Sequence, residues 1–291
     1  MLSQETDYVG SNVRDSSIVL SLVSSAGTGV KTIRFTVPLI LPTATSAVLR
    51  SSGDIVFGVS GRPYAGPEEK SPIWTNPKTG TKKFSCTYES SYIFSIDPKT
   101  LDIRKQAFFP ENGKITRLKQ FGDRTYGTFL FSHDCRIETN VRLVEVSEEL
   151  ELTTLFESAN VNSIRVSDFA ISSDGFVLVG VASTFLPVAL VNKTMTLEEL
   201  KNYKGPDLLD DSVWDKYDQT SNALILVLSR DGKLQGDKIL YDVRNRAFSS
   251  LADLGFGHFM AVGSALGNNG WIVKFEMKAQ SKRPAAFERV H

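Results

Sequence analysis

Short apolar or alternating runs, each of strand length, recur along the chain. They begin at positions 18, 92, 141, 224 and 271, and the first is residues 18–23, IVLSLV. Successive side chains of a strand point to opposite faces, whereas a surface helix needs apolar residues at i, i+3, i+4 and i+7 over ten or more positions. Only residues 197–203 show a helical spacing. The pattern therefore predicts an all-β protein.

A strand–turn–strand unit precedes four of these runs. The units cover residues 47–61, 116–131, 168–183 and 251–267. Three of them close on a glycine followed shortly by a serine, which are Gly58, Gly180 and Gly263 with Ser60, Ser183 and Ser264. Aspartate, proline and glycine cluster in the turns because glycine permits positive φ and proline presets φ. In one repeat we predict four strands, at residues 165–171, 176–182, 223–229 and 238–242.

The spacing of the runs indicates one repeated unit. The intervals between their starts are 74, 49, 83 and 47 residues, and the two long ones contain segments unlike strands, 62–90 and 184–221. Without those segments of 29 and 38 residues, both long intervals shorten to 45. A period in the forties with four strands per unit is typical of propeller blades. We therefore expect residues 1–291 to form a single β-propeller of about four to five four-stranded blades, with 62–90 and 184–221 as surface loops.

The repeat resembles a divergent bacterial propeller repeat, with a consensus like DGGYIVAGS followed by a WLVKLD strand. The matching segments are residues 174–180, DGFVLVG, and residues 271–275, WIVKF, after Gly263 and Ser264. The resemblance covers most of residues 8–277 outside the two insertions and implies a propeller, but no single activity. Only one unit carries the tryptophan. The chain starts and stops inside a unit, so we also expect the two termini to complete one blade together, which would leave no open sheet edge.

Composition and charge narrow the classes of partner. The chain has 33 basic and 33 acidic residues and a formal net charge of zero, whereas nucleic-acid binders usually carry a basic excess or stripe. No apolar run approaches the roughly 18 residues of a membrane span, and the N-terminus does not have the pattern of a signal peptide. We expect no nucleic acid and no membrane as partners, and a cytoplasmic or particle-associated location. Cys86 and Cys135 are expected to be separate thiols.

The search for chemistry predicts no catalytic residues, no metal and no cofactor. Histidines are few and no zinc motif occurs. The cluster His133-Asp134-Cys135 reads as a polar loop, because adjacent residues of an extended chain point to opposite faces. A propeller glycosidase would need two carboxylates at a fixed separation. Asp168 and Asp253 occupy equivalent places in two units by this reading, and a repeated polar residue at a strand end explains them better than catalysis.

The two insertions are the candidate binding segments. Long loops on repeat scaffolds often bind ligands, and tryptophan and tyrosine are common interface anchors and sugar-stacking platforms. The first insertion is rich in proline and lysine, and the second is acidic. The candidate binding residues are Tyr64, Trp74, Tyr88, Tyr203, Trp214 and Tyr217. Packing of each loop over its own blade explains the same aromatics equally well.

Two functions follow as hypotheses. The first is a non-enzymatic binding and assembly scaffold that acts through protein–protein contacts, as a structural component of a larger complex or virion. The alternative is a carbohydrate-binding, lectin-like protein or a glycoside-hydrolase propeller. An aromatic interface and a sugar-stacking shelf have the same sequence signature, so the sequence leaves both open.

Overall fold

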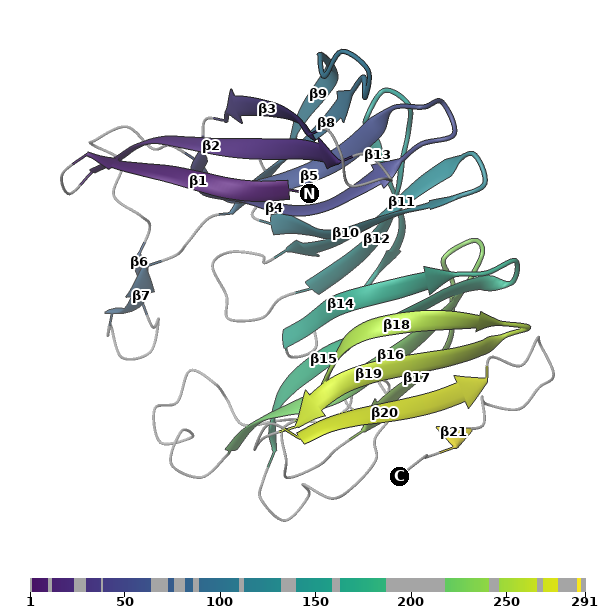
Figure 1. The fold of residues 1–291 in the computed structure, drawn as a ribbon. Coiled ribbons are helices and arrows are strands. Elements are labelled where there is room, and N and C mark those ends of the chain that lie inside the picture. Colours follow the sequence, from purple (N-terminus) through teal and green to yellow (C-terminus); the bar gives the residue numbers. More distant parts are fainter. Residues whose placement is uncertain are drawn as a thin grey trace. The chain divides into compact units, whose positions relative to one another are not determined.

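The computed structural model of the chain is built from β-strands (Figure 1). It describes residues 2–9, 12–23, 30–37, 39–63, 73–75, 82–85, 89–109, 113–131, 140–158, 163–186, 218–240, 246–265, 269–276 and 287–288. The chain divides into two compact units, here called unit 1 and unit 2, and each is described by itself. Unit 1 comprises Met1–Thr75, Lys82–Cys135 and Leu143–Thr154, and unit 2 comprises Asn76–Thr81, Arg136–Arg142 and Leu155–His291.

Four of the sheets have four strands each, hydrogen-bonded in a simple order along the chain. We call these sheets blades. The first blade is β4 (Leu39–Leu49), β5 (Ile55–Pro63), β8 (Ser90–Ile96) and β9 (Ile103–Phe109). The second is β10 (Gly113–Phe121), β11 (Arg124–Phe131), β12 (Asn140–Val146) and β13 (Leu152–Glu157). The third is β14 (Ser163–Ile171), β15 (Gly175–Leu186), β16 (Asp218–Ser229) and β17 (Leu234–Leu240). The fourth is β18 (Ala247–Gly255), β19 (His258–Ala265), β20 (Asn269–Glu276) and β21 (Phe287–Glu288).

These sheets confirm the predicted all-β fold built of four-stranded propeller blades. The five apolar runs lie in β2 (Asn12–Val23), β8, β12, β16 and β20, and the four strand–turn–strand units form the first two strands of the four blades. The four strands predicted within one repeat correspond to β14 to β17. The last of them begins at Leu234, earlier than predicted, because the turn after β16 ends sooner.

Two predictions about the segments outside the blades differ from the structure. The described N-terminal strands, β1 (Leu2–Val9), β2 and β3 (Val30–Thr36), form a three-stranded sheet of their own, and β20 pairs with β21, so no described blade combines strands from both termini. The first insertion was expected to lack strands, yet β6 (Ile73–Thr75) pairs with β7 (Lys82–Ser85).

The first strand of every blade carries a β-bulge at the same place. The shift in pairing falls between Ala44 and Ser46 in β4, and at the equivalent steps of β10, β14 and β18. The extra residue always has a hydroxyl group, and the four are Thr45, Thr116, Ser167 and Ser249. Three of these hydroxyls donate to a carbonyl oxygen of the second strand at 3.2–3.3 Å. The bulge, which accentuates strand twist and bends the strand, is therefore a structural repeat alongside the apolar runs.

In unit 1 two apolar clusters hold the sheets together. One joins the N-terminal sheet to the first blade and includes Ile18, Leu20, Phe57 and Phe94. Within it, the rings of Phe57 and Phe94 stack with their centroids 5.2 Å apart. The second cluster joins the first and second blades through residues such as Ile115. Strands that bury alternate residues against the next sheet in this way form a stable core only when blades are stacked.

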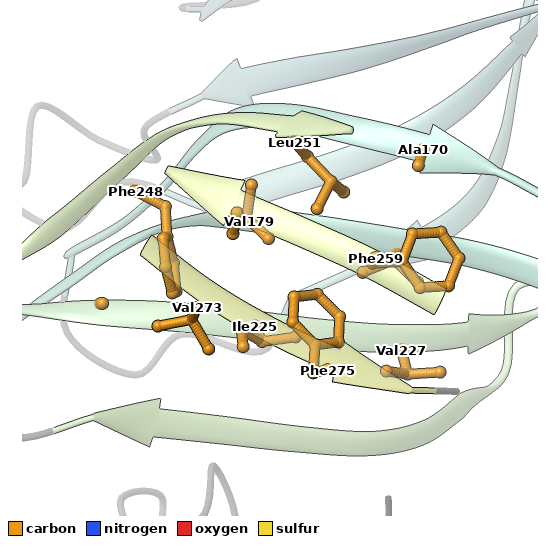
Figure 2. Packing of buried hydrophobic residues seen from close by; sticks show 12 residues of the cluster. Ala170, Val179, Ile225, Val227, Phe248, Leu251, Phe259, Val273 and Phe275 are labelled. Carbon is orange, nitrogen blue, oxygen red and sulfur yellow. The ribbon is translucent and has the colours of Figure 1, made fainter. Parts of the chain in front are cut away.

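In unit 2 the third and fourth blades share one apolar core (Figure 2). Val179 and Ile225 of the third blade face Phe248, Phe259 and Phe275 of the fourth. The rings of Phe259 and Phe275 stack with centroids 5.7 Å apart. Offset aromatic pairs of this kind contribute roughly 0.5–1.5 kcal/mol beyond their buried area. The fourth blade is therefore fixed to the third by packed side chains from β18, β19 and β20.

Candidate functional site

The aromatic residues predicted to bind ligands fall largely outside the described part of the chain. Trp74 lies in β6, where its backbone pairs with Phe84. The other five, Tyr64, Tyr88, Tyr203, Trp214 and Tyr217, lie outside the described residues, as do His133, Cys86 and Cys135. The binding role of the insertions therefore stays a prediction, and the functional site must be sought elsewhere.

Asp168, one of the two carboxylates weighed for glycoside hydrolysis, ties two strands of unit 2 together. Asp168 directly follows the bulge of β14 and is only 5% exposed. One carboxylate oxygen accepts the backbone N–H of Phe169 at 2.9 Å. The other accepts the backbone N–H of Leu251 at 3.0 Å and the hydroxyl of Ser250 at 3.2 Å, both in β18. These bonds satisfy a buried polar side chain, which is the ordinary requirement for burying one, and give Asp168 a structural role.

Asp253, the other carboxylate, has a different place and a different role. The residue of β18 that corresponds to Asp168 is Ser250, because each directly follows its bulge. Our expectation that Asp168 and Asp253 are equivalent was therefore wrong. Asp253 stands near the exposed end of β18, where it accepts the N–H of Gly255 at 2.8 Å and shapes the turn. Such local bonding is the usual reason for aspartate in turns.

The described residues offer no other obvious reaction centre. No group of three or more histidine, cysteine, aspartate or glutamate side chains among them could hold a metal ion. Within the same ranges, no helix is long and apolar enough to cross a membrane. The exposed surface of the fourth blade offers a different kind of site, one made of apolar side chains at a turn.

The turn between β18 and β19 projects an aromatic side chain into solvent. Gly255 pairs with His258, which leaves Phe256 and Gly257 as a two-residue loop. Both loop residues have positive φ, 54° for Phe256 and 77° for Gly257. Two positive φ values in a two-residue hairpin loop are the signature of a type I′ turn. Phe256 is 101% exposed and Leu254, two residues earlier, is 47% exposed, so the turn presents two large apolar side chains.

The backbone of this turn is unfavourable for the residue it carries. A left-handed conformation costs a residue other than glycine on the order of 1–3 kcal/mol, and asparagine tolerates it best. Phe256 also gains no burial, although a buried phenylalanine side chain is worth about 1.5–3 kcal/mol. Within the described part of the chain, neither burial nor backbone preference accounts for an aromatic residue here. Backbone strain that stability does not explain points to function.

The equivalent turns of the other blades serve as internal comparisons. The turn of the second blade is Gly122-Asp123, in which only the glycine has positive φ. The turns of the first and third blades, residues 50–54 and 172–175, read RSSGD and SSDG, and their positive φ values also fall on glycine. Among the four described blades, only the fourth places an aromatic residue within the loop of this turn. The turn leads directly into β19, where Phe259 is fully buried in the core between the third and fourth blades.

The projecting turn, which we define as Leu254–His258, was not predicted as a site, because it is short and lies outside the two long insertions. A signal was present. Residues 254–258 read LGFGH, with phenylalanine between two glycines where the other units carry serine, aspartate and glycine. Glycine has no side chain that could cover the phenylalanine and favours tight turns, so the two flanking glycines were the available signal.

Comparison with known proteins yields only distant structural similarity. The sequence matches no protein-family model and no curated protein. Pyrococcus horikoshii acylaminoacyl peptidase, in its orthorhombic crystal form, is 13% identical with a TM-score of 0.45, over 95% of this chain and 35% of that one. An acylaminoacyl peptidase in complex with Z-Gly-Gly-Phe-chloromethyl ketone is 14% identical with a TM-score of 0.43, over 94% of this chain and 40% of that one. The chain thus spans well under half the length of these proteins.

Proposed function

We propose that the chain is a non-enzymatic binding scaffold that docks onto a protein partner through the projecting turn, with Phe256 as the anchor. The observation that carries this proposal is the combination of full exposure and left-handed backbone at Phe256. Binding energy at protein interfaces concentrates in a few aromatic anchors that fill a pocket of the partner. Burial of Phe256 in a pocket of the partner would provide the favourable free energy of removing this side chain from water, which the free protein does not gain.

A rigid turn suits this role better than a flexible loop. The backbone of the turn is fixed by the bond from Gly255 to Asp253 and by the pairing of Gly255 with His258. An anchor held in one conformation loses little entropy on binding. Leu254, two residues before the anchor, is a second exposed apolar side chain in the turn. The partner is therefore expected to offer an apolar pocket of aromatic size with a polar rim around it.

The test is a crosslinking pulldown from the native source with wild-type protein and two variants. Phe256→Asn removes the anchor and supplies the residue that a type I′ turn prefers, so the fold is retained. Leu49→Asn is the matched control, since Leu49 is also a large apolar residue, 63% exposed, at the end of β4 and has no positive φ. We expect a stoichiometric partner with wild type and Leu49→Asn, and its loss with Phe256→Asn. Capture that survives Phe256→Asn would refute the proposal.

The same variants also test the carbohydrate-binding alternative. Phenylalanine stacks on sugar faces as well as on protein, so a glycan array with wild type and Phe256→Asn separates the two. Binding to a defined glycan that depends on Phe256, without any protein partner, would replace the protein-docking proposal by a lectin. The involvement of Asp168 in three hydrogen bonds argues against hydrolysis by that residue.

A further inference from the structure

Two carboxylates lie at the projecting turn. Asp253 is exposed and accepts the backbone N–H of Gly255 at 2.8 Å, so its carboxylate is held at the start of the two-residue loop. Glu276, the last residue of β20, pairs with His258 across the sheet and is half-buried beside the other end of the loop. Both ends of the turn that presents Phe256 therefore carry a negative charge.

Basic side chains of the fourth blade do not neutralise these carboxylates. In the described part of this blade the cations are Lys274 and Arg246. Lys274 pairs with Met260 across the strands and, within the same described ranges, forms no ion pair with either carboxylate. The guanidinium of Arg246 lies over the ring of Trp271, 4.8 Å from its centroid. The turn thus combines an exposed apolar anchor with negative charge that the described side chains leave uncompensated.

This combination restricts the charge of a surface that the turn can meet. The polar rim of an interface surrounds its apolar centre, so a pocket that encloses Phe256 brings its rim to Asp253 and Glu276. An acidic rim would repel both carboxylates, and an apolar rim would remove water from them without providing a hydrogen-bond or charge partner. A basic rim has neither cost.

We propose that the partner of the projecting turn is a protein whose pocket for Phe256 is rimmed by lysine or arginine side chains, which pair with Asp253 and Glu276. This inference rests on the proposed docking function and adds the chemistry of the partner's surface. Charge pairs at a rim act mainly on the rate of association and are screened by salt, whereas burial of an apolar side chain is not. Docking should therefore have two separable contributions, an apolar one from the anchor and a salt-sensitive one from the two carboxylates.

The probe for the test is the protein that the pulldown recovers with wild type and loses with Phe256→Asn, purified and titrated against the full chain by surface plasmon resonance. Asp253→Asn retains an oxygen that can accept the N–H of Gly255, and Glu276→Gln retains the size of the side chain, so both variants keep the turn. Glu151→Gln is the matched control, because Glu151 is an exposed carboxylate of the second blade, next to β13, and its replacement changes the net charge equally.

The expected effects are changes in affinity and in association rate. Asp253→Asn and Glu276→Gln should each weaken binding about two- to fivefold, the range for an exposed charge pair, and the double variant should weaken it about tenfold, since separate pairs add. Most of the loss should appear as slower association. Raising the salt concentration from about 50 mM to about 500 mM should weaken the wild type more than the double variant. Glu151→Gln should bind like the wild type.

Three results would overturn the inference. Binding that requires Phe256 but is unchanged or tighter in the double variant would leave the docking function standing and remove the basic rim. Equal weakening by Glu151→Gln would assign the effect to net charge rather than to the turn. Failure to recover any protein that depends on Phe256 would overturn the docking function itself, and this inference with it.

Discussion

Replacing Gly263 by alanine tests how the fourth blade is packed. Gly263 pairs with Phe248 on one side and with Trp271 on the other. The indole of Trp271 crosses the position that a side chain of residue 263 would occupy and stacks on Phe248, with ring centroids 4.8 Å apart. A Cβ atom on Gly263 would lie 2.1 Å from the carbonyl oxygen of Ala247 and 2.8 Å from Nε1 of Trp271. Both distances are too short, so the backbone of β18 and the indole must move.

The size of the effect follows from three opposing contributions. Overpacking of a well-packed core costs about 1–3 kcal/mol. Displacement of Trp271 from Phe248 forfeits part of a stacking contact worth roughly 0.5–1.5 kcal/mol. Alanine restricts the unfolded chain more than glycine does and returns about 0.4–1 kcal/mol. The first two contributions exceed the third, so we expect Gly263→Ala to lower the free energy of unfolding by about 2 kcal/mol.

The measurement is urea unfolding, followed by tryptophan fluorescence and circular dichroism. Gly270→Ala is the matched control, because Gly270 lies in β20 one residue before Trp271 and its added Cβ meets no atom within 4 Å. We expect the control to be as stable as the wild type or slightly more stable. If Gly263→Ala unfolds at the same urea concentration as Gly270→Ala, the packing of Trp271 over the glycine does not contribute as described.

Three further predictions concern single side chains. Phe256→Asn should raise the free energy of unfolding by about 1 kcal/mol, because asparagine fits a left-handed turn position; a urea midpoint at or below that of the wild type would contradict the assigned strain. Asp168→Ala should lower it by about 3 kcal/mol, since the buried N–H of Leu251 loses its acceptor, whereas an unchanged midpoint would show that the contact contributes nothing. The side chain of Lys233 and the hydroxyl of Ser229 hold the pKa of Asp231 at about 2. The carboxylate therefore favours the folded state above its unfolded pKa, and this contribution is lost as pH falls toward 2; NMR titration should show a higher pKa in Lys233→Ala, and no change would rule out the ion pair.

The apolar periodicity was sufficient to place most of the sheet. Alternating runs such as residues 92–96 carry the pattern of a strand whose two faces differ, and they lie in β8, β12, β16 and β20. The short strands of the first insertion were not predicted, because a strand of three residues such as Ile73–Thr75 is too short to show a periodic pattern. The start of β17 was placed too late because residues 234–237, LQGD, contain a single apolar residue, Leu234, which is 38% exposed.

The polar contacts between strands could not be read from the sequence. Which residue of β18 is equivalent to Asp168 of β14 depends on where the bulge of each strand lies. A bulge adds one residue to a strand without a recognisable change in composition, so the sequence does not reveal its position. The hydroxyl residue at each bulge becomes visible as a repeat only once the register is known. The exposure of Phe256 likewise depends on φ values that sequence patterns indicate only through the flanking glycines.

The way the two long insertions join the blades has an evolutionary consequence. Each connects the second strand of its sheet to the third, β5 to β8 and β15 to β16. The paired ends of β15 and β16 meet at Leu186 and Asp218, so the sheet itself holds the two ends of the second insertion together. Doubling the length of a flexible loop costs only about 0.6 kcal/mol of closure entropy. Selection can therefore lengthen, shorten or replace either insertion while the apolar core of the blades, and with it the fold, stays constant.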